Sequence, residues 1–198
     1  MNRRHGSALE AALRSAVIGQ LDTHGYHGLT YEGVAAAART SKTVLYRRWP
    51  TKAQMVVSAL GDDIGSVGAQ VPDTGSLAGD LTALLSAVRD EFSDHKRAAV
   101  LGLLADLDDR AAAQMRDHLL VSASDMLIPL LDRARRRHEL GSVELPARAL
   151  RLPFDLLLHD ALIRGRLRDN DIGDIVSQCV VPLYASLSRG ILLAHRPS

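Results

Sequence analysis

The sequence predicts an all-α protein, in which an N-terminal three-helix head precedes a larger helical body. Apolar residues recur at helical spacing through most of the 198 residues, whereas alternating β-branched runs bounded by hairpin turns are not found. The composition is 46% hydrophobic but only 4% aromatic, which suits an aliphatic core between packed helices. One helical stripe comprises Leu77, Leu81, Leu84, Leu85, Val88 and Phe92.

The helices of the head are marked by residues that cap helix ends. Ser7, followed by Glu10 in a capping-box pattern, predicts the start of the first helix. Gly25 predicts the end of that helix. Thr30 and Ser41 predict the starts of two short helices, because their hydroxyls can accept a hydrogen bond from the first helical turn.

A fourth helix, predicted to begin after Thr51, links the head to the body. The Gly-, Asp- and Ser-rich residues 61–75 predict the end of this helix and a flexible connection. Pro129, Pro153 and Pro182 are each expected to kink a body helix or to mark its boundary. These body helices are expected from Ser76 onward and at about 96–106, 109–139, 146–168 and 171–194.

The net charge is only +1, but the charge is unevenly distributed along the chain. Residues 1–55 hold eight Lys or Arg and three Asp or Glu, which gives +5. The remaining residues hold sixteen Lys or Arg and twenty Asp or Glu, which gives −4. A polyanion such as DNA is therefore expected to bind the head.

Several classes of protein are excluded by patterns that the sequence lacks. No apolar stretch approaches the roughly 20 residues needed to span a bilayer, and the first residues lack the apolar segment of a signal peptide. We therefore expect a cytoplasmic protein without a membrane partner. The single Cys179 excludes a disulfide framework within the chain. Because no Gly-rich phosphate loop, nucleophile elbow or zinc-binding spacing is found, we expect no enzymatic activity, no metal and no other cofactor.

Residues 30–52 form the most informative segment. They predict two short helices around a tight corner, followed by a basic and aromatic exit. This arrangement is typical of a helix-turn-helix, whose second helix enters the major groove of DNA.

This segment resembles the tetracycline-repressor (TetR) family of bacterial regulators. The family pattern runs, in order, through Thr, Ile-Ala, Ala-Gly-Val-Ser, Thr-Leu-Tyr, an aromatic pair and Ser-Lys. The corresponding residues of this chain, in the same order, are Thr30, Val34-Ala35, Ala38-Arg39-Thr40-Ser41, Val44-Leu45-Tyr46, Arg48-Trp49 and Thr51-Lys52. The sequence departs from the pattern at Arg39 and Thr43, where the family often has Gly, and at Val44, where Thr is common. The resemblance implies a DNA-binding head at residues 1–52 and a ligand-binding and dimerisation body at residues 53–198.

Side chains on and beside the second helix of this motif are candidates for DNA contact. Lys42 and Arg47 can neutralise phosphates or donate to guanine, Thr43 can touch a thymine methyl, and the Tyr46 hydroxyl can bind phosphate. The alternative is an ordinary solvated basic face. Phosphate contacts are also expected at the start of the preceding helix and, by resemblance, at the linker helix. The predicted DNA-binding residues are Thr30, Tyr31, Ser41, Lys42, Thr43, Tyr46, Arg47 and Lys52.

The resemblance also implies that the body binds a small molecule and that this binding releases the DNA. Met and Phe suit an adaptable, largely apolar pocket, although residues of these types more often belong to an ordinary core. The candidates on expected inward faces are Phe92, Met115, His118, Met126, Phe154 and His159.

In the family, the last two long helices meet their twins across a two-fold axis. Residues 146–168 and 172–193 are long and apolar and are joined by a short turn, so they are expected to form such an antiparallel pair. Burial within one subunit is the alternative. The candidate dimer residues are Leu158, Leu162, Val180, Leu183 and Leu187.

The sequence therefore favours a homodimeric repressor that binds a pseudo-palindromic operator in double-stranded DNA and is released by a small-molecule effector. The alternative is an activator or an architectural DNA-binding protein without an inducer.

Overall fold

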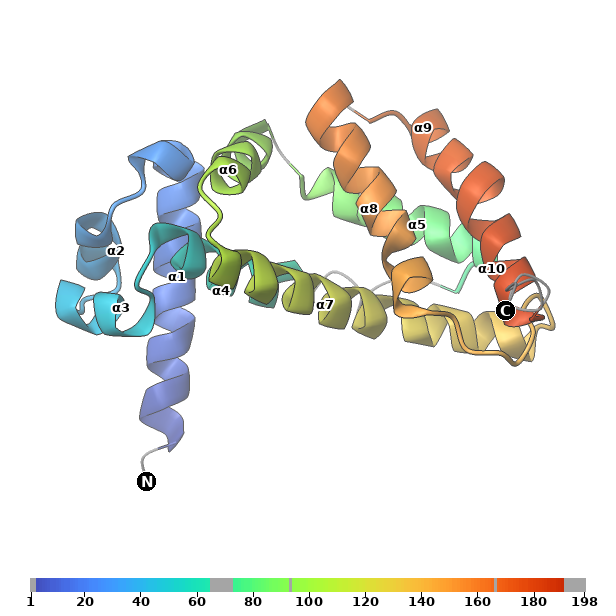
Figure 1. The fold of residues 1–198 in the computed structure, drawn as a ribbon, viewed down its shortest axis with the longest axis horizontal. Coiled ribbons are helices and arrows are strands. Elements are labelled where there is room, and N and C mark those ends of the chain that lie inside the picture. Colours follow the sequence, from blue (N-terminus) through green and yellow to red (C-terminus); the bar gives the residue numbers. More distant parts are fainter. Residues whose placement is uncertain (1–2, 65–72, 93, 166, 191–198) are drawn as a thin grey trace. The chain divides into compact units, whose positions relative to one another are not determined.

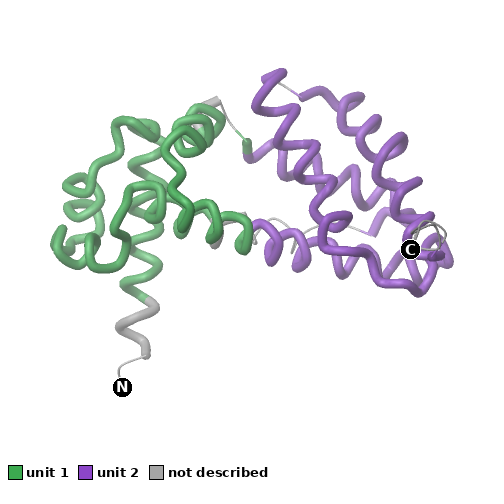
Figure 2. Tube along the Cα trace, viewed as in Figure 1, with its two compact units in different colours: residues 1–63, 92–118 green, residues 64–91, 119–198 purple. Residues whose placement is uncertain are grey.

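The computed structural model describes residues 3–64, 73–92, 94–165 and 167–190 (Figure 1). Within these ranges every regular element is a helix, which confirms the predicted all-α class. None of the helices in this part of the chain is both long and apolar enough to cross a membrane. The chain forms two compact units (Figure 2): residues 1–63 with 92–118, and residues 64–91 with 119–198.

Unit 1 is built around the first helix. Helix α1 (Arg3–Gly28) packs against α2 (Tyr31–Ala37) and α6 (Asp94–Ala105), and α2 packs against α3 (Lys42–Arg48). Helix α4 (Lys52–Ile64) and the start of α7 (Asp109–Arg136) complete the unit. The expected head, residues 1–52, is therefore the first part of a larger compact unit, because α6 shares its core. This core includes Leu13, Val17, Leu21, Val34, Leu45, Met55, Val56 and Leu103.

The start of α1 differs from the sequence prediction. The helix begins at Arg3, so Ser7 lies inside it and not at its start. The residues before Ser7 are helical themselves, and a capping-box pattern cannot exclude such an extension. Gly25 does interrupt the helix, with a φ of 65° that favours glycine, and one further helical turn runs to Gly28. The Thr51 cap is confirmed, since its hydroxyl accepts from the Gln54 N–H at 3.2 Å.

Unit 2 contains the remaining helices. Helix α5 (Leu77–Asp90) contacts α8 (Ala147–Arg164), α9 (Asp169–Asp174) and the π-helical segment η2 (Ile175–Val180), which runs into α10 (Val181–Ser188). The Tyr184 hydroxyl is buried and donates to the Ala149 carbonyl at 3.0 Å. The predicted connection around residues 61–75 and the end of the predicted last helix lie largely outside the described residues. The core includes Leu81, Leu84, Leu85, Leu127, Leu130, Leu131, Leu157, Ile172, Val176 and Tyr184.

The predicted last helix contains a π-helical turn where Pro182 follows. The Val181 N–H bonds the Val176 carbonyl, five residues earlier, instead of the usual four. Proline lacks an N–H and crowds the carbonyl four residues before it, so a wider turn ahead of Pro182 relieves that crowding. Pro182 therefore marks a boundary between helical types, as predicted, whereas Pro129 and Pro153 lie inside α7 and α8.

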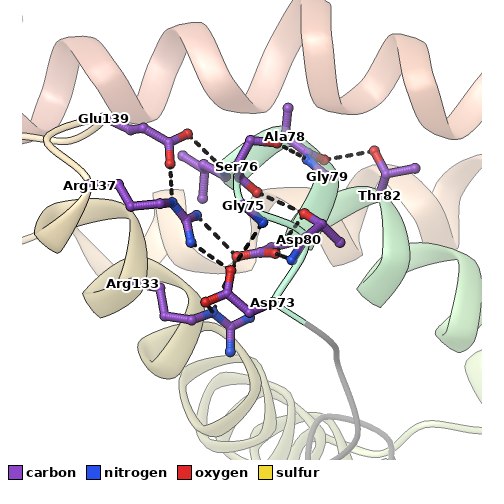
Figure 3. A network of polar contacts seen from close by, with 12 residues as sticks. Asp73, Gly75, Ser76, Ala78, Gly79, Asp80, Thr82, Arg133, Arg137 and Glu139 are labelled. Carbon is purple, nitrogen blue, oxygen red and sulfur yellow. Dashed lines mark hydrogen bonds and ion pairs between the residues drawn. The ribbon is translucent and has the colours of Figure 1, made fainter.

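A polar network ties the start of α5 to the end of α7 (Figure 3). The carboxylate of Asp80 is fully buried and accepts from the Thr74 hydroxyl at 2.8 Å, from Arg133 Nε at 3.3 Å and from Arg137 Nη2 at 3.2 Å. Glu139 accepts from Arg137 Nε at 2.5 Å and from the backbone N–H of Leu77 at 2.7 Å. The buried charges are therefore paired and hydrogen-bonded, as burial requires.

Candidate nucleic-acid interface

The two helices of the predicted DNA-binding motif begin at the predicted caps. The Thr30 hydroxyl accepts from the Gly33 N–H at 3.1 Å and precedes α2. The Ser41 hydroxyl accepts from the Val44 N–H at 3.4 Å and precedes α3. Both hydroxyls therefore fix helix starts, whatever further contacts they make.

The corner between α2 and α3 keeps a glycine-like geometry without a glycine. Arg39 has a φ of 52°, in the left-handed region. The Arg39 N–H bonds the Ala36 carbonyl at 3.2 Å, and the Thr40 N–H bonds the Ala35 carbonyl at 2.9 Å. These two bonds form a Schellman motif, which usually places glycine at the residue that Arg39 occupies. The departure from the family pattern therefore preserves the turn at a cost in backbone strain.

Helix α3 has one inner and one outer face. Leu45 is fully buried in the unit 1 core, and Trp49 at the end of the helix is buried as well. The outer face carries an exposed set of polar, aromatic and basic side chains, and five of the eight predicted DNA-binding residues belong to it. They are Ser41, Lys42, Thr43, Tyr46 and Arg47.

Tyr31 supports this face from α2. Its ring stacks on Tyr46, with 4.1 Å between ring centroids and 22° between planes. Its hydroxyl donates to the Trp49 carbonyl at 2.8 Å, and burial, followed by the neighbouring Tyr46, raises the pKa of Tyr31 to about 12. The hydroxyl proton is thus engaged within unit 1, and the predicted phosphate contact at Tyr31, by its hydroxyl or by backbone N–H, stays a prediction.

Two acidic residues that were not predicted for this face pair with its cations. Lys42 Nζ lies 2.5 Å from Glu32 Oε1, and Arg48 pairs with Glu10 of α1. Arg48 also lies over the Trp49 ring, 5.1 Å from its centroid. Sequence spacing gives no signal for these pairs, because they join residues of different helices.

Lys52 is held at the start of α4. Its ammonium donates to the Tyr26 carbonyl at 3.0 Å and lies 4.3 Å from the centroid of the Tyr26 ring. The Tyr26 hydroxyl in turn donates to Asp106 at 2.6 Å. Burial is the largest cause that raises the pKa of Tyr26, and the hydrogen bond to Asp106 adds to it. Lys52 is half-buried, so it is less accessible than the basic residues of α3.

Asp108 anchors the start of α4 from the other side. Its carboxylate accepts from the Thr51 hydroxyl at 3.0 Å, from Gln54 Nε2 at 3.2 Å and from the Ala111 N–H at 2.7 Å. It therefore caps α7 and fixes α4 at once. The N–H of Ala111, then these side-chain donors, hold the pKa of Asp108 below its ordinary value. An aspartate just before a helix is a recognisable cap signal, but its contact with α4 requires the folded unit.

Two family patterns match the chain. Residues 9–59 match the family described as bacterial regulatory proteins, tetR family. Residues 71–179 match the family described as tetracyclin repressor-like, C-terminal domain. The chain belongs to the TetR family. It is a DNA-binding transcriptional regulator of this family, and its helix-turn-helix lies within the first match.

Relatives of this TetR-family regulator agree with that assignment. An uncharacterised HTH-type transcriptional regulator of Mycobacterium tuberculosis is 31% identical over 178 residues, 89% of this chain and 88% of the relative. A DNA-binding transcriptional repressor TetR of Mycobacteroides abscessus is 29% identical over 181 residues, 90% of this chain and 95% of the relative. The crystal structure of a TetR family transcription regulator shares the fold, with a TM-score of 0.72 and 24% identity over 87% of this chain and 96% of that one.

The predicted ligand residues of this TetR-family chain do not fall in one compact unit. Phe92, Met115 and His118 belong to unit 1, whereas Met126, Phe154 and His159 belong to unit 2. Met115 packs against the unit 1 core, and Met126 is buried in unit 2. The inward orientation expected for His159 is wrong, because its side chain is 66% exposed and its Nδ1 lies 3.1 Å from Asp160.

The predicted dimer residues also divide into two groups. Leu158, Leu162 and Leu183 are partly exposed. Val180 has no exposed surface and Leu187 is buried, so both side chains lie in the core of their own subunit. The prediction that Val180 lies in a core shared with a second copy is therefore wrong. For these two residues the structure has the stated alternative, burial within one subunit. The buried stripe runs through Val176, Val180 and Tyr184, so Leu183, next to Tyr184, keeps part of its surface accessible.

Proposed function

We propose that this TetR-family regulator is a homodimeric repressor that binds a pseudo-palindromic operator through residues 30–49 and is released by a small-molecule effector. The observation that carries the proposal is the outer face of α3, where Lys42, Thr43, Tyr46 and Arg47 are exposed around a buried Leu45. A helix with one exposed polar face and one buried apolar face presents hydrogen-bond donors to base edges and phosphates, while its buried face packs against the rest of the domain. The name of the Mycobacteroides abscessus relative, a repressor, supports the direction of regulation.

Apolar surface on the body supports the proposed dimer. Leu158, Leu162 and Leu183 keep part of their surface accessible, and Ile163 of α8 is 70% exposed. A second copy that covers these side chains would remove apolar surface from water. A two-fold dimer would carry two heads, which suits half-sites roughly 34 Å, one helical turn of DNA, apart. Residues 1–52 then serve DNA binding, and residues 53–198 serve dimerisation and effector binding.

The effector is proposed to be largely apolar. Met115, Met126 and Phe154 are buried or half-buried side chains that adapt to apolar ligands. The proposal therefore places apolar small molecules first in a search for an inducer.

The first test is binding of the purified protein to its own upstream intergenic DNA and to random DNA of equal length. We expect a specific complex whose footprint has dyad symmetry. Tyr46→Ala and Lys42→Ala should weaken this complex while light scattering still reports a dimer. Equal binding to both DNAs would contradict the proposal of a specific operator and favour an architectural role. If deletion of the protein lowered expression of a reporter gene, the protein would be an activator. Apolar compounds that dissociate the complex would identify the effector class.

A further inference from the structure

The Glu32–Lys42 pair places an acidic side chain on the surface that carries the DNA-binding cations. Glu32 lies in the first turn of α2, and Lys42 is the first residue of α3. Their charged atoms are 2.5 Å apart, while the two side chains remain 63% and 51% exposed, respectively. The pair therefore connects the two helices of the motif across their corner, at a site open to solvent.

The contact changes the charge that α3 offers to DNA. The hydrogen bond from Lys42 is the largest cause that lowers the pKa of Glu32, and the same bond raises the pKa of Lys42, so both groups stay charged near neutral pH. A phosphate that approaches Lys42 must compete with this carboxylate and also meets its like charge. Exposed ion pairs contribute little to folding stability, so the main consequence of this pair concerns binding.

We infer that Glu32 is a specificity-determining residue, which restrains Lys42 from sequence-independent phosphate contact and orients its ammonium for use on the operator. The inference rests on the proposed operator function. On scrambled DNA, the gain from a Lys42–phosphate contact is largely cancelled by Glu32. On the operator, the same carboxylate holds the Lys42 ammonium on the outer face, where lysine can donate to guanine O6 and N7.

The test compares Glu32→Gln with the wild type on two DNAs. One is the duplex that the wild-type protein selects from a random-sequence library, and the other is a scrambled duplex of equal length and composition. We expect Glu32→Gln to bind the scrambled duplex about threefold to fivefold more tightly, with a log–log salt slope steeper by about 0.9, as one added phosphate contact would give. The selected duplex should change less than twofold, so the ratio of the two affinities falls.

Two further variants separate this role from simple charge or structure. Asp22→Asn makes the same change in net charge on the exposed surface of α1 and should leave the affinity ratio unchanged. In a Lys42→Ala background, Glu32→Gln should lose its effect on scrambled DNA, because Glu32 acts through Lys42. Thermal unfolding should be nearly unchanged in Glu32→Gln.

The outcomes distinguish the inference from the function on which it rests. If Glu32→Gln raised both affinities equally, or if Asp22→Asn lowered the ratio as much, the effect would be one of net charge and the inference would be wrong. An unchanged salt slope on the scrambled duplex would overturn it as well. If the wild type enriched no sequence, the proposed operator function would fail, and the scrambled-duplex slope would still decide whether Glu32 restrains Lys42.

Discussion

Tyr31 stacks on Tyr46 at a centroid distance of 4.1 Å, and its hydroxyl is anchored to the Trp49 carbonyl 2.8 Å away. The outer face of α3 is thus supported by a residue of α2 that is itself fixed by the end of α3. Tyr46 is half-exposed, so this stack limits the directions in which its hydroxyl can point.

The stack predicts different results for two substitutions of Tyr31. Tyr31→Ala removes an aromatic pair worth about 0.5–1.5 kcal/mol and frees Tyr46, so DNA affinity should fall about threefold to tenfold. Tyr31→Phe keeps the stack and should bind DNA like the wild type, while losing about 1 kcal/mol of stability with the hydrogen bond to Trp49. Fluorescence anisotropy and thermal unfolding measure the two effects. If Tyr31→Phe bound as weakly as Tyr31→Ala, the hydroxyl itself would contact DNA.

The left-handed Arg39 predicts that a substitution can stabilise the motif. Arg39→Gly should raise the free energy of unfolding by about 0.5–1 kcal/mol, because glycine adopts a φ of 52° without a side-chain clash. Arg39→Ala is the matched control, since it removes the same side-chain charge but keeps the Cβ atom. Chemical denaturation followed by circular dichroism compares the two variants. Equal stability of the two would show that Arg39 stores no backbone strain.

Local signals in the sequence were sufficient for the starts of α2, α3 and α4. Thr30, Ser41 and Thr51 each act on an N–H three residues later, so the information lies within one helical turn. The outer face of α3 followed from the same register, because the inward position of Leu45 fixes which neighbours face solvent.

The remaining site contacts depend on how separate helices meet, and for this reason the sequence did not reveal them. Glu32 and Lys42 are ten residues apart, and Tyr26 and Lys52 are twenty-six apart. The errors at Val180 and His159 have a different origin, since both positions were assigned from an ideal helical period. A stripe of apolar residues does not show whether a side chain such as Val180 faces the core of its own subunit or a second copy, and it does not fix the orientation of a polar residue at its edge, such as His159.

The buried Asp80 predicts a large and pH-dependent loss of stability in Asp80→Asn. Burial acts to raise the pKa of Asp80. Hydrogen bonds from the backbone N–H and hydroxyl of Thr74 and from Arg137, together with the charge of Arg133, outweigh burial and hold this pKa below the ordinary aspartate value of 3.8. A carboxylate whose pKa is lowered by folding stabilises the protein at pH values above its pKa in the unfolded state. This contribution is lost as the pH falls through its pKa in the folded state. At neutral pH the variant should lose about 3–5 kcal/mol, because the arginines then lack their buried partner.

Acid titration of stability checks this prediction. The wild type should lose this contribution only as the pH falls below about 4, whereas Asp80→Asn should lack it at every pH. Asp132→Asn removes an exposed partner of Arg135 on the same helix and should cost less than about 1 kcal/mol. A similar loss in both variants at neutral pH would show that the network in Figure 3 is no more stabilising than a surface ion pair.

Lys52 provides the last prediction, because two roles for it can be separated by salt. Its ammonium is bound to the Tyr26 carbonyl and ring, and the family resemblance implies a phosphate contact as well. Lys52→Met keeps the apolar stem but removes the charge, so it should weaken binding to all DNA sequences equally and flatten the log–log salt slope by about 0.9. Lys52→Arg, which keeps the charge, should preserve the slope. If Lys52→Met lowered the melting temperature while the salt slope stayed unchanged, Lys52 would serve only to fix α4 to the end of α1. A loss of DNA affinity confined to one base position would indicate that Lys52 reads a base instead.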